Sequence, residues 1–454
     1  MVPDSRMTPA AVAPFVDRFL SVAEGKCARL ARKWMDGRGG MGAPVFTRAG
    51  KYTARGWTEW TQGFLFGGPL LVFDATGDRA SLDAGIRGTL DRMAPHVSHT
   101  GVHDHGFNNV STYGTLRRLI LEGRVPDHGG MLAQCELALK VSGAVQAARW
   151  TATTETGGGY VYSFNGPHSL FCDTIRSCRS LVLAHQLGHA LMGENDRPVS
   201  LLDRAAAHIR STLAWNVFHG EGRDLYDVPG RVAHESLFNV NDGKYRCPST
   251  QQGYSPFSTW TRGLAWVLLG CAEQLEWFSR PCVQFEGKAA FLREMERAAR
   301  ATADFYLCHS SADGIPFWDT GAPGLAAGVA DYAGPSDPWD GPEPVDSSAA
   351  AISAQGLIRL GLRLGSRGSG YLRAGLGVSR TLFSPPYLSE APKHEGLLLH
   401  SVYHRPRGWD YVPKGRRIPC GESSLWGDYH ALELAVLVKR LARREPPATF
   451  FAGG

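Results

Sequence analysis

The sequence predicts an all-α protein, and more specifically an (α/α)6 toroid of six helical hairpins that spans residues 1–454 as a single domain. Three observations lead to this prediction. About a dozen segments have the helical spacing of apolar residues, Gly/Pro loops separate them, and no stretch resembles a linker between domains. An even number of similar helices joined in pairs favours a closed ring. A right-handed α-solenoid is the alternative, although the segments lack the fixed repeat period of a solenoid.

Each helical segment is identified by apolar residues that recur every three to four positions. In the segment that starts at Ser169, for example, Leu170, Phe171, Ile175 and Cys178 would lie on one stripe. In chain order the predicted helices are Pro9–Trp34, Thr58–Asp78, Ser81–Val97, Asn109–Gly123, Met131–Trp150, Ser169–Leu191, Val199–Phe218, Ser258–Arg280, Gly287–Ser310, Ser347–Gly365, Gly370–Leu388 and Ser424–Arg444.

Two long irregular stretches interrupt this pattern, at Thr320–Asp346 and His404–Ser423. Structureless loops of this length inside a compact domain are usually functional or disordered. Both stretches carry Trp and charged residues, so we expect rim loops over a pocket, at about 320–346 and 404–423.

Composition excludes several classes of protein. A chain with 43% hydrophobic and 20% charged residues is ordinary for a globular protein, and no run is long and apolar enough to span a membrane. The formal net charge of +5 is too small to indicate a nucleic-acid partner, though it would not repel an acidic sugar. Nine scattered cysteines without a CxxC pair favour buried thiols in a reducing compartment. We therefore expect a cytoplasmic location, with export of a trimmed form left open.

The stretch GVHDHGFNN, which contains Asp104, is the first candidate for chemistry. A carboxylate just before a helix can be an N-cap that accepts backbone hydrogen bonds, a metal ligand or a catalytic group. The flanking His103 and His105 match no standard zinc spacing, and residues two apart do not share a helix face. No metal is therefore expected here.

Asp173 is the second candidate, at the start of the stripe described above. An acid in the first turn is commonplace because it stabilises the helix dipole, so position alone does not decide its role. His185 and His189 form an i, i+4 pair in HQLGH, but Gln186 stands where a metalloprotease has its glutamate. A structural role is expected for that pair.

The densest group of functional side chains lies in QQGYSPFSTWTRGLAW. Arg262 and Trp266 are four residues apart, and Gln252 lies upstream. Arg pairs with a carboxylate through two parallel hydrogen bonds, and an indole can pack on a sugar ring. The segment therefore suits an acidic sugar, although a buried core helix with a surface arginine explains it equally well.

Taken together, these motifs resemble the unsaturated glucuronyl hydrolases, glycoside hydrolase family 88. The resemblance runs from about Trp57 to Leu437. The fragments that carry it are, in order, WTQGFLFGGPLLVFDATGD, HDHGF, FNGPHSLFCDTIRS, QQGYSPFSTWTRGLAW, GIPFWD, VDSSAAAISAQGLIRL and LWGDYHALE.

The resemblance implies an (α/α)6 toroid without metal or cofactor. Its implied substrate is an oligosaccharide, left by a polysaccharide lyase, that ends in a 4,5-unsaturated uronic acid. Asp104 and Asp173 map onto the catalytic pair, and His234, Gln252, Arg262 and Trp266 map onto substrate-binding positions. Asp173 would protonate C4 of the vinyl ether, and water would then add at C5.

Two electrostatic expectations follow from that assignment. The charge of Asp104 and an apolar wall should raise the pKa of Asp173, so that it holds a proton near neutral pH. His105, which stands where the family commonly has a hydrophobic residue, should donate to Asp104 and lower its pKa.

Three other functions stay open at this point. The related unsaturated rhamnogalacturonyl hydrolases share the fold and the chemistry. A polysaccharide lyase on a similar toroid would create the double bond instead of consuming it, and Tyr254 and His234 are candidates for its Tyr/His catalytic base. A carbohydrate-binding toroid without catalysis is the third, and the two aspartates count against it.

Overall fold

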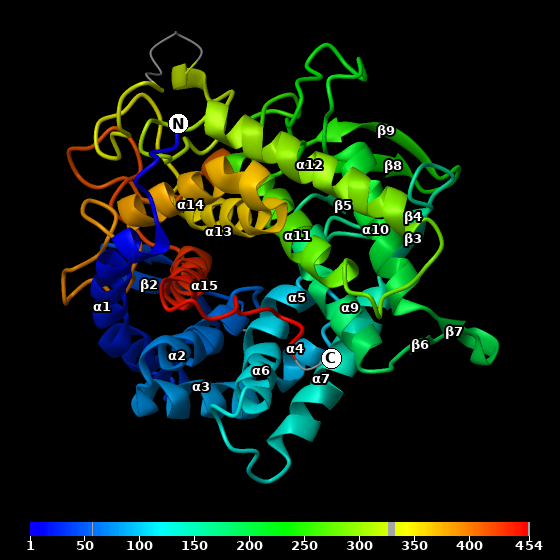
Figure 1. The fold of residues 1–454 in the computed structure, drawn as a ribbon, viewed down its shortest axis with the longest axis horizontal. Coiled ribbons are helices and arrows are strands. Elements are labelled where there is room, and N and C mark those ends of the chain that lie inside the picture. The colour runs from blue at the N-terminus through cyan, green and yellow to red at the C-terminus, as the bar shows by residue number, and fades with distance from the viewer. Residues whose placement is uncertain (57, 326–331, 453–454) are drawn as a thin grey trace.

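A computed structural model describes residues 1–56, 58–325 and 332–452 of the chain. Trp57, where the resemblance begins, and residues 326–331 of the predicted first rim loop lie outside the described residues. Within them, helices follow one another around a ring, and the last helix returns beside the second (Figure 1). This contact closes the ring, so the predicted all-α toroid is confirmed and an open solenoid is excluded.

The helices of the ring form two layers, an outer and an inner one, which differ in how much of each helix is buried. The outer helices bury one stripe each, whereas inner helices such as α11 and α13 are buried on nearly every side. The outer layer consists of α1 (Pro9–Met35), α3 (Arg79–Arg92), α7 (Met131–Ala148), α10 (Leu201–Trp215), α12 (Lys288–Cys308) and α14 (Ser369–Leu382).

The inner layer alternates with the outer one along the chain. Two of its members are broken, and a π-helical turn at Val110–Gly114 joins two α-helical pieces in one of them. The inner helices are α2 (Gln62–Thr76), α5 (His105–Asn108) continued by α6 (Thr115–Leu121), α8 (Thr174–Ser177) continued by α9 (Arg179–Gln186), α11 (Thr261–Phe278), α13 (Ser347–Leu364) and α15 (Leu425–Ala442). The short α4 (Ala94–Val97) precedes α5.

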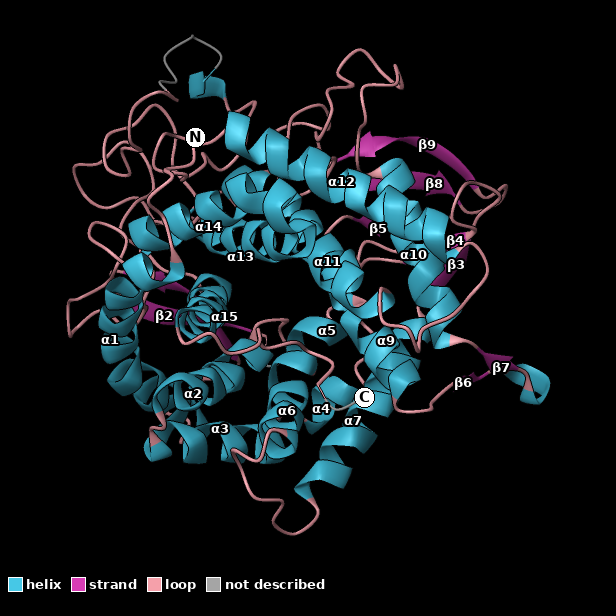
Figure 2. Ribbon diagram, in the orientation of Figure 1, coloured by secondary structure: helices cyan, strands magenta, loops and turns pink. Residues whose placement is uncertain are grey.

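Small antiparallel sheets lie around the ring. Figure 2 shows β8 and β9 at its edge and the β6–β7 hairpin projecting outward. Their strands are β1 (Ala43–Arg48), β2 (Lys51–Arg55), β3 (Trp150–Ala152), β4 (Gly159–Val161), β5 (Ser169–Phe171), β6 (Leu191–Met192), β7 (Pro198–Val199), β8 (Glu235–Asn239) and β9 (Lys244–Ser249).

Several predicted helix boundaries are wrong, and the clearest case is the helix predicted at Ser169–Leu191. Ser169–Phe171 was expected to be helical but forms β5, which pairs with β8 so that Phe171 lies opposite Glu235. The apolar run fits a buried strand as well as a helix, and the distant partner strand decides between them. The helix starts only at Thr174, which leaves Asp173 at the junction.

All inner helices begin at the same end of the ring. Contacts near their first turns join neighbouring helices: Gly63 N donates to Asn108 Oδ1 at 2.8 Å, Arg262 pairs with Asp346 at 2.9 Å, and Trp426 Nε1 donates to Ser348 Oγ at 3.0 Å. Since both rim loops directly precede inner helices, their ends also lie here. The positive ends of the helix dipoles therefore converge on this end of the ring.

The chain carries neither a disulfide nor a membrane helix in its described part. All nine cysteines are free, with Cys247, Cys282 and Cys308 exposed and most of the others buried. In the part of the chain that the structure describes, no helix has the length and apolar character needed to cross a bilayer.

The first turns of α5 and α8 touch at Gly106. A Cβ at this position would lie 2.2 Å from Ser177 O and 2.6 Å from Ser177 Cα, and Gly106 N donates to Ser177 Oγ at 2.9 Å. Only glycine allows this approach, which holds Asp104 next to Asp173.

We predict that Gly106→Ala lowers the free energy of unfolding by about 1–3 kcal/mol, the usual cost of overpacking a rigid contact. Gly370→Ala is the control, because no atom lies within 4 Å of its added Cβ. It should be neutral or slightly stabilising, as expected for alanine in place of glycine in a helix. Urea unfolding measures both, and a Gly106→Ala protein as stable as the parent would contradict the close contact.

Candidate active site

The two candidate aspartates lie together, with His103 between them. His103 Nε2 is 3.8 Å from Asp104 Oδ1 and 3.8 Å from Asp173 Oδ1, which is an ion-pair distance rather than a hydrogen bond. Asp104 precedes α5 and Asp173 precedes α8, yet neither side chain caps its helix. The capping role that sequence left open for each of them is therefore absent.

Burial and charge set the protonation of this trio. Burial, together with the charges of Asp173 and Glu59, raises the pKa of Asp104 to about 6, although His103 opposes the shift. Burial alone would raise the pKa of Asp173, but His103 and then His234 outweigh it, so this pKa is lowered. Burial opposes a charge on His103, but the two carboxylates raise its pKa.

The expectation that Asp104 raises the pKa of Asp173 is therefore wrong for the free protein. The imidazolium of His103 lies between the carboxylates and attracts both of them more strongly than they repel each other. Asp173 is ionised and paired with His103, and Asp104 is the acid that titrates near pH 6.

The expected contact between His105 and Asp104 is also wrong. His105 Nδ1 bonds Ser142 Oγ at 3.0 Å, and its Nε2 bonds the carbonyl of His99 at 3.0 Å. Burial lowers its pKa to about 4, so the ring is neutral and serves the packing of α5 on α7.

His234 presents one free N–H close to Asp173. Its Nδ1 accepts the backbone N–H groups of Gln251 at 3.0 Å and Gln252 at 3.3 Å, which places the hydrogen of the neutral ring on Nε2. This Nε2 is buried and bonds no group of the described residues. Phe171 and Trp260 hold the ring, with centroids 4.4 Å and 4.7 Å away.

Arg262 is buried at the start of α11, and its guanidinium is already engaged. It pairs with Asp346 at 2.9 Å, and it donates to Gln252 Oε1 at 3.1 Å and to the carbonyl of Tyr403 at 2.8 Å. Only 1% of the residue is exposed. In this structure Arg262 therefore ties together α11, α13 and the start of the second rim loop.

Trp266 lies one turn further along α11 and is 2% exposed. Its ring packs against Phe107 at 5.0 Å and His430 at 4.8 Å. Trp266 thus packs against α5 and α15, and it shares one face of α11 with Arg262, four residues earlier. A stacking contact with sugar stays a prediction for this residue.

Comparison with known proteins adds to this geometry. No protein-family model matches the chain. An unsaturated glucuronyl hydrolase of Formosa agariphila is 28% identical over 382 residues, which cover 83% of this chain and 78% of that protein. An unsaturated chondroitin disaccharide hydrolase of Streptococcus pyogenes is 23% identical over 401 residues, covering 85% of this chain and 83% of that protein.

Solved structures agree with these relatives over nearly the whole chain. The unsaturated glucuronyl hydrolase of Bacillus sp. GL1 superposes with a TM-score of 0.70 at 20% identity, covering 94% of this chain and 97% of that one. One specific for heparin gives 0.72 at 19% identity, covering 96% and 100%. In sequence and in fold the chain thus resembles the unsaturated glucuronyl hydrolases. A mutant of the Streptococcus agalactiae family member has been crystallised with dGlcA-GalNAc6S.

Two further titratable side chains of the candidate site, His404 and Glu59, were not identified from the sequence, because loops bring them to this site. His404 is 5% exposed, and neither of its ring nitrogens bonds a described group. Its pKa is lowered to about 4 by burial and by the charges of Arg262 and Arg407. Glu59 follows β2, and burial raises its pKa. Only the presence of His404 in an irregular, charged loop gave a signal.

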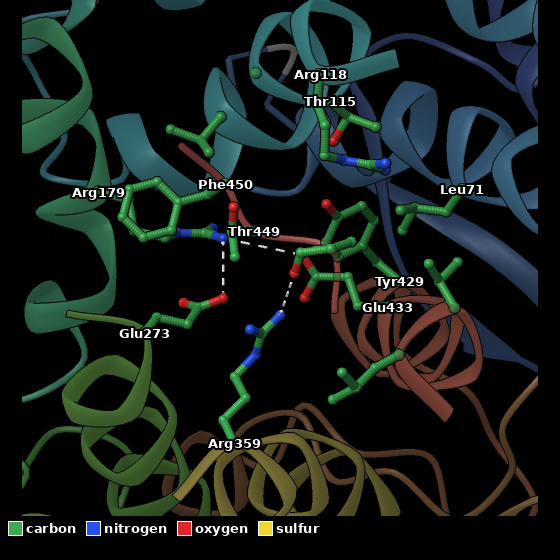
Figure 3. Close-up of a pocket in the computed structure, with 15 residues that line it drawn as sticks. Leu71, Thr115, Arg118, Arg179, Glu273, Arg359, Tyr429, Glu433, Thr449 and Phe450 are labelled. Carbon is green, nitrogen blue, oxygen red and sulfur yellow. Dashed lines mark hydrogen bonds and ion pairs between the residues drawn. The ribbon is translucent and has the colours of Figure 1, made fainter. Parts of the chain in front are cut away.

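A cavity of about 50 Å³ lies deeper in the ring, away from the aspartates (Figure 3). Glu273, in its wall, is twelve residues after Thr261, which is about 18 Å along the helix. Its charges pair internally, with Arg179 3.6 Å from Glu273 and 3.9 Å from Glu433, and Thr449 and Phe450 of the C-terminal segment close it. We therefore assign this cavity to the interior of the fold.

The described residues contain no group of three or more His, Cys, Asp or Glu side chains placed to hold a metal ion.

Several buried histidines make the stability of the protein pH-dependent. Burial lowers the pKa of His105, His234 and His404 to about 4 and that of His208 to about 3. In the unfolded chain these rings titrate near about 6.5. The stability they provide is therefore complete above about pH 6.5 and is lost as the pH falls toward 4, at up to about 3 kcal/mol for each ring.

Asp104, Asp319 and Asp428, each with a pKa raised to about 6 by burial, act in the opposite sense. Because the histidines are more numerous and more strongly shifted, we predict a urea midpoint that falls from pH 6.5 to pH 4.5. His404→Gln should make that slope shallower, whereas His128→Gln at an exposed position is the control. A midpoint that is constant or higher at pH 4.5 would refute the assignment of neutral rings.

Proposed function

We propose that the protein removes a 4,5-unsaturated glucuronyl residue from the non-reducing end of lyase-generated oligosaccharides by hydrating the vinyl ether double bond. The observation that carries this proposal is the pair of buried carboxylates, Asp104 and Asp173. They have no capping role and share one imidazole. Similarity to unsaturated glucuronyl hydrolases supports the class of substrate, and the nine free cysteines support a reducing, cytoplasmic location.

In the proposed reaction Asp173 delivers a proton to C4 of the unsaturated ring. Asp173 is ionised in the free protein, and the proton resides on His103 at 3.8 Å. Entry of an anionic sugar adds negative charge and removes water, and both raise the pKa of Asp173 until His103 passes the proton on. Positive charge then develops at C5 and its ring oxygen.

Water completes the hydration at C5. It gives one proton to the Asp173 carboxylate, which returns it to His103, so that both residues end the cycle as they began and the net reaction adds one water. The hemiketal formed at C5 opens, and the rest of the oligosaccharide leaves. Since no bond forms to C1, the separation of the two carboxylates does not predict inversion or retention.

Neutral N–H donors receive the sugar in this proposal. His234 offers Nε2–H, and Gln252 offers its amide while Arg262 holds its oxygen. His404 adds a ring without a partner on the same side. Asp104, when ionised, accepts from the ring hydroxyls. Arg262 acts by positioning Gln252, unless the sugar displaces one of its present partners.

The lyase alternative is less well supported. A lyase requires a base that removes the proton at C5, and Tyr254 and His234 were the candidates. The accepting nitrogen of His234 is already used by two backbone N–H groups, and Tyr254 is 51% exposed. Neither side chain is prepared to take up a proton.

The first test follows the ultraviolet absorbance of the C4=C5 bond with unsaturated disaccharides from chondroitin, hyaluronan, heparin, gellan and rhamnogalacturonan. We predict that the signal falls, and that Asp173→Asn lowers kcat by about 10²- to 10⁴-fold, the usual contribution of a general acid. Asp17→Asn, an exposed acid on α1, is the control. A rising signal on intact polymer would mean a lyase, and a fully active Asp173→Asn would refute the role of that residue.

A second test uses the charge of Glu59. Burial raises the pKa of Asp104 to about 6, with contributions from the charges of Asp173 and Glu59, so Glu59→Gln lowers that pKa. If Asp104 acts as the ionised acceptor, the acid limb of kcat/KM lies near pH 6 and moves to lower pH in Glu59→Gln. Glu445→Gln, near the C-terminus, should leave the profile unchanged. An acid limb at the same pH in both variants would contradict this role.

A further inference from the structure

A basic groove of about 420 Å³ lies on the outer layer, between the C-terminal half of α1, the beginning of β2 and the segment from Pro392 to Glu395. Its volume falls within the usual range of sites for small ligands. Glu395 is the only carboxylate among its described lining residues. The cations that line it are Lys26, Arg29, Arg32, Lys33, Arg38 and Lys51.

Part of this positive charge is not paired with an acid, although Arg32 also donates to the carbonyl of Ala80 at 3.3 Å. Lys26 is buried and donates to backbone carbonyls of the 389–396 segment, so it holds the groove together. Lys33 and Lys51 share Glu395, at 2.8 Å and 3.4 Å. Arg29 and Arg32 are exposed and pair with no acid in the part of the chain that the structure describes.

The sequence of α1 points in the same direction. Arg29, Arg32 and Lys33 lie three and four residues apart, where like charges repel each other on one helix face. No acid occurs between Lys26 and Met35 to relieve them. The helix dipole offsets only part of this cost at the last turn. An anion bound in the groove would offset the rest.

We propose that this groove is a second binding site, for a glycan segment that carries carboxylate or sulfate groups; this inference rests on the proposed function for its ligand class. Two arginines with planar forks suit such groups, because each fork can bind two oxygens in parallel. No Phe, Tyr or Trp is among the described lining residues, whereas single-stranded nucleic acids are bound largely by stacking on aromatic rings.

The β1–β2 hairpin connects the groove with the candidate active site. Lys51 begins β2 in the groove, and Arg55 ends it about 13 Å further along, at the usual rise of a strand. Arg55 lies 4.5 Å from the ring of Trp409 and 5.6 Å from that of Tyr403, whose carbonyl accepts from Arg262. The groove thus binds a part of the glycan outside the unit that is cleaved.

The test measures binding without turnover. A heparin-derived hexasaccharide with a saturated non-reducing end, which cannot be a substrate, is titrated into the protein by calorimetry at low salt. We expect Arg29→Glu/Arg32→Glu to weaken binding by about tenfold or more, because it reverses two charges in the groove. Arg293→Glu/Arg297→Glu on α12 makes the same change in charge elsewhere and should bind like the parent.

Three results would overturn the proposal. The first is that the parent and the groove variant bind the hexasaccharide equally. The second is that the α12 control loses as much affinity for it as the groove variant does. The third is that the parent binds a DNA oligonucleotide of the same charge as tightly as the hexasaccharide, and the groove variant loses this binding too. Unsaturated disaccharide is hydrolysed equally by parent and groove variant if the groove lies outside the reacting unit. If the parent protein hydrolyses no unsaturated disaccharide but still binds the hexasaccharide through the groove, the proposed function is refuted and the proposed binding site is not.

Discussion

The common direction of the inner helices is the constraint on which the site depends. Outer and inner helices alternate along the chain, so every inner helix begins at one end of the ring, and their first turns are bonded to one another. Dipoles aligned in this way favour negative charge at that end. Helix ends and imidazoles therefore surround two nearly buried carboxylates, at a place where burial alone would neutralise the acids.

The helix dipoles favour negative charge at this end of the ring, and His103 determines which of the two aspartates carries that charge. Without it, two carboxylates at this separation would share a proton, and burial would raise both of their pKa values. With it, the pKa of Asp173 is lowered, while that of Asp104 stays raised to about 6. The two acids thus differ in the free protein although both precede short inner helices. In the proposed reaction, the proton that reaches C4 therefore starts on His103, next to Asp173, rather than on Asp173 itself.

Periodicity in the sequence identified the helical segments and favoured their closure into a ring, while the open solenoid was excluded only by the contact between α2 and α15. It failed at Ser169–Phe171, where a strand on the far side of a loop decides the structure. Asp104 and Asp173 could be identified by resemblance, but their pKa values could not. His103 was visible beside Asp104, yet its effect requires Asp173, which only the fold brings near. His404 was hidden in an irregular loop for the same reason.

Arg262 shows how the remainder of the site depends on this constraint. A buried guanidinium is costly unless all its donors are used, and breaking such a pair leaves an uncompensated charge. Here Asp346 at the start of α13 supplies the opposite charge, while Gln252 and the backbone of Tyr403 accept the other hydrogens. The position of His404 follows directly, since it is the next residue in the chain. The rim loop is thus attached to the ring at a buried charge. Its later part also fixes His404, because Asp410 accepts a hydrogen bond from the backbone N–H of His404 at 3.0 Å.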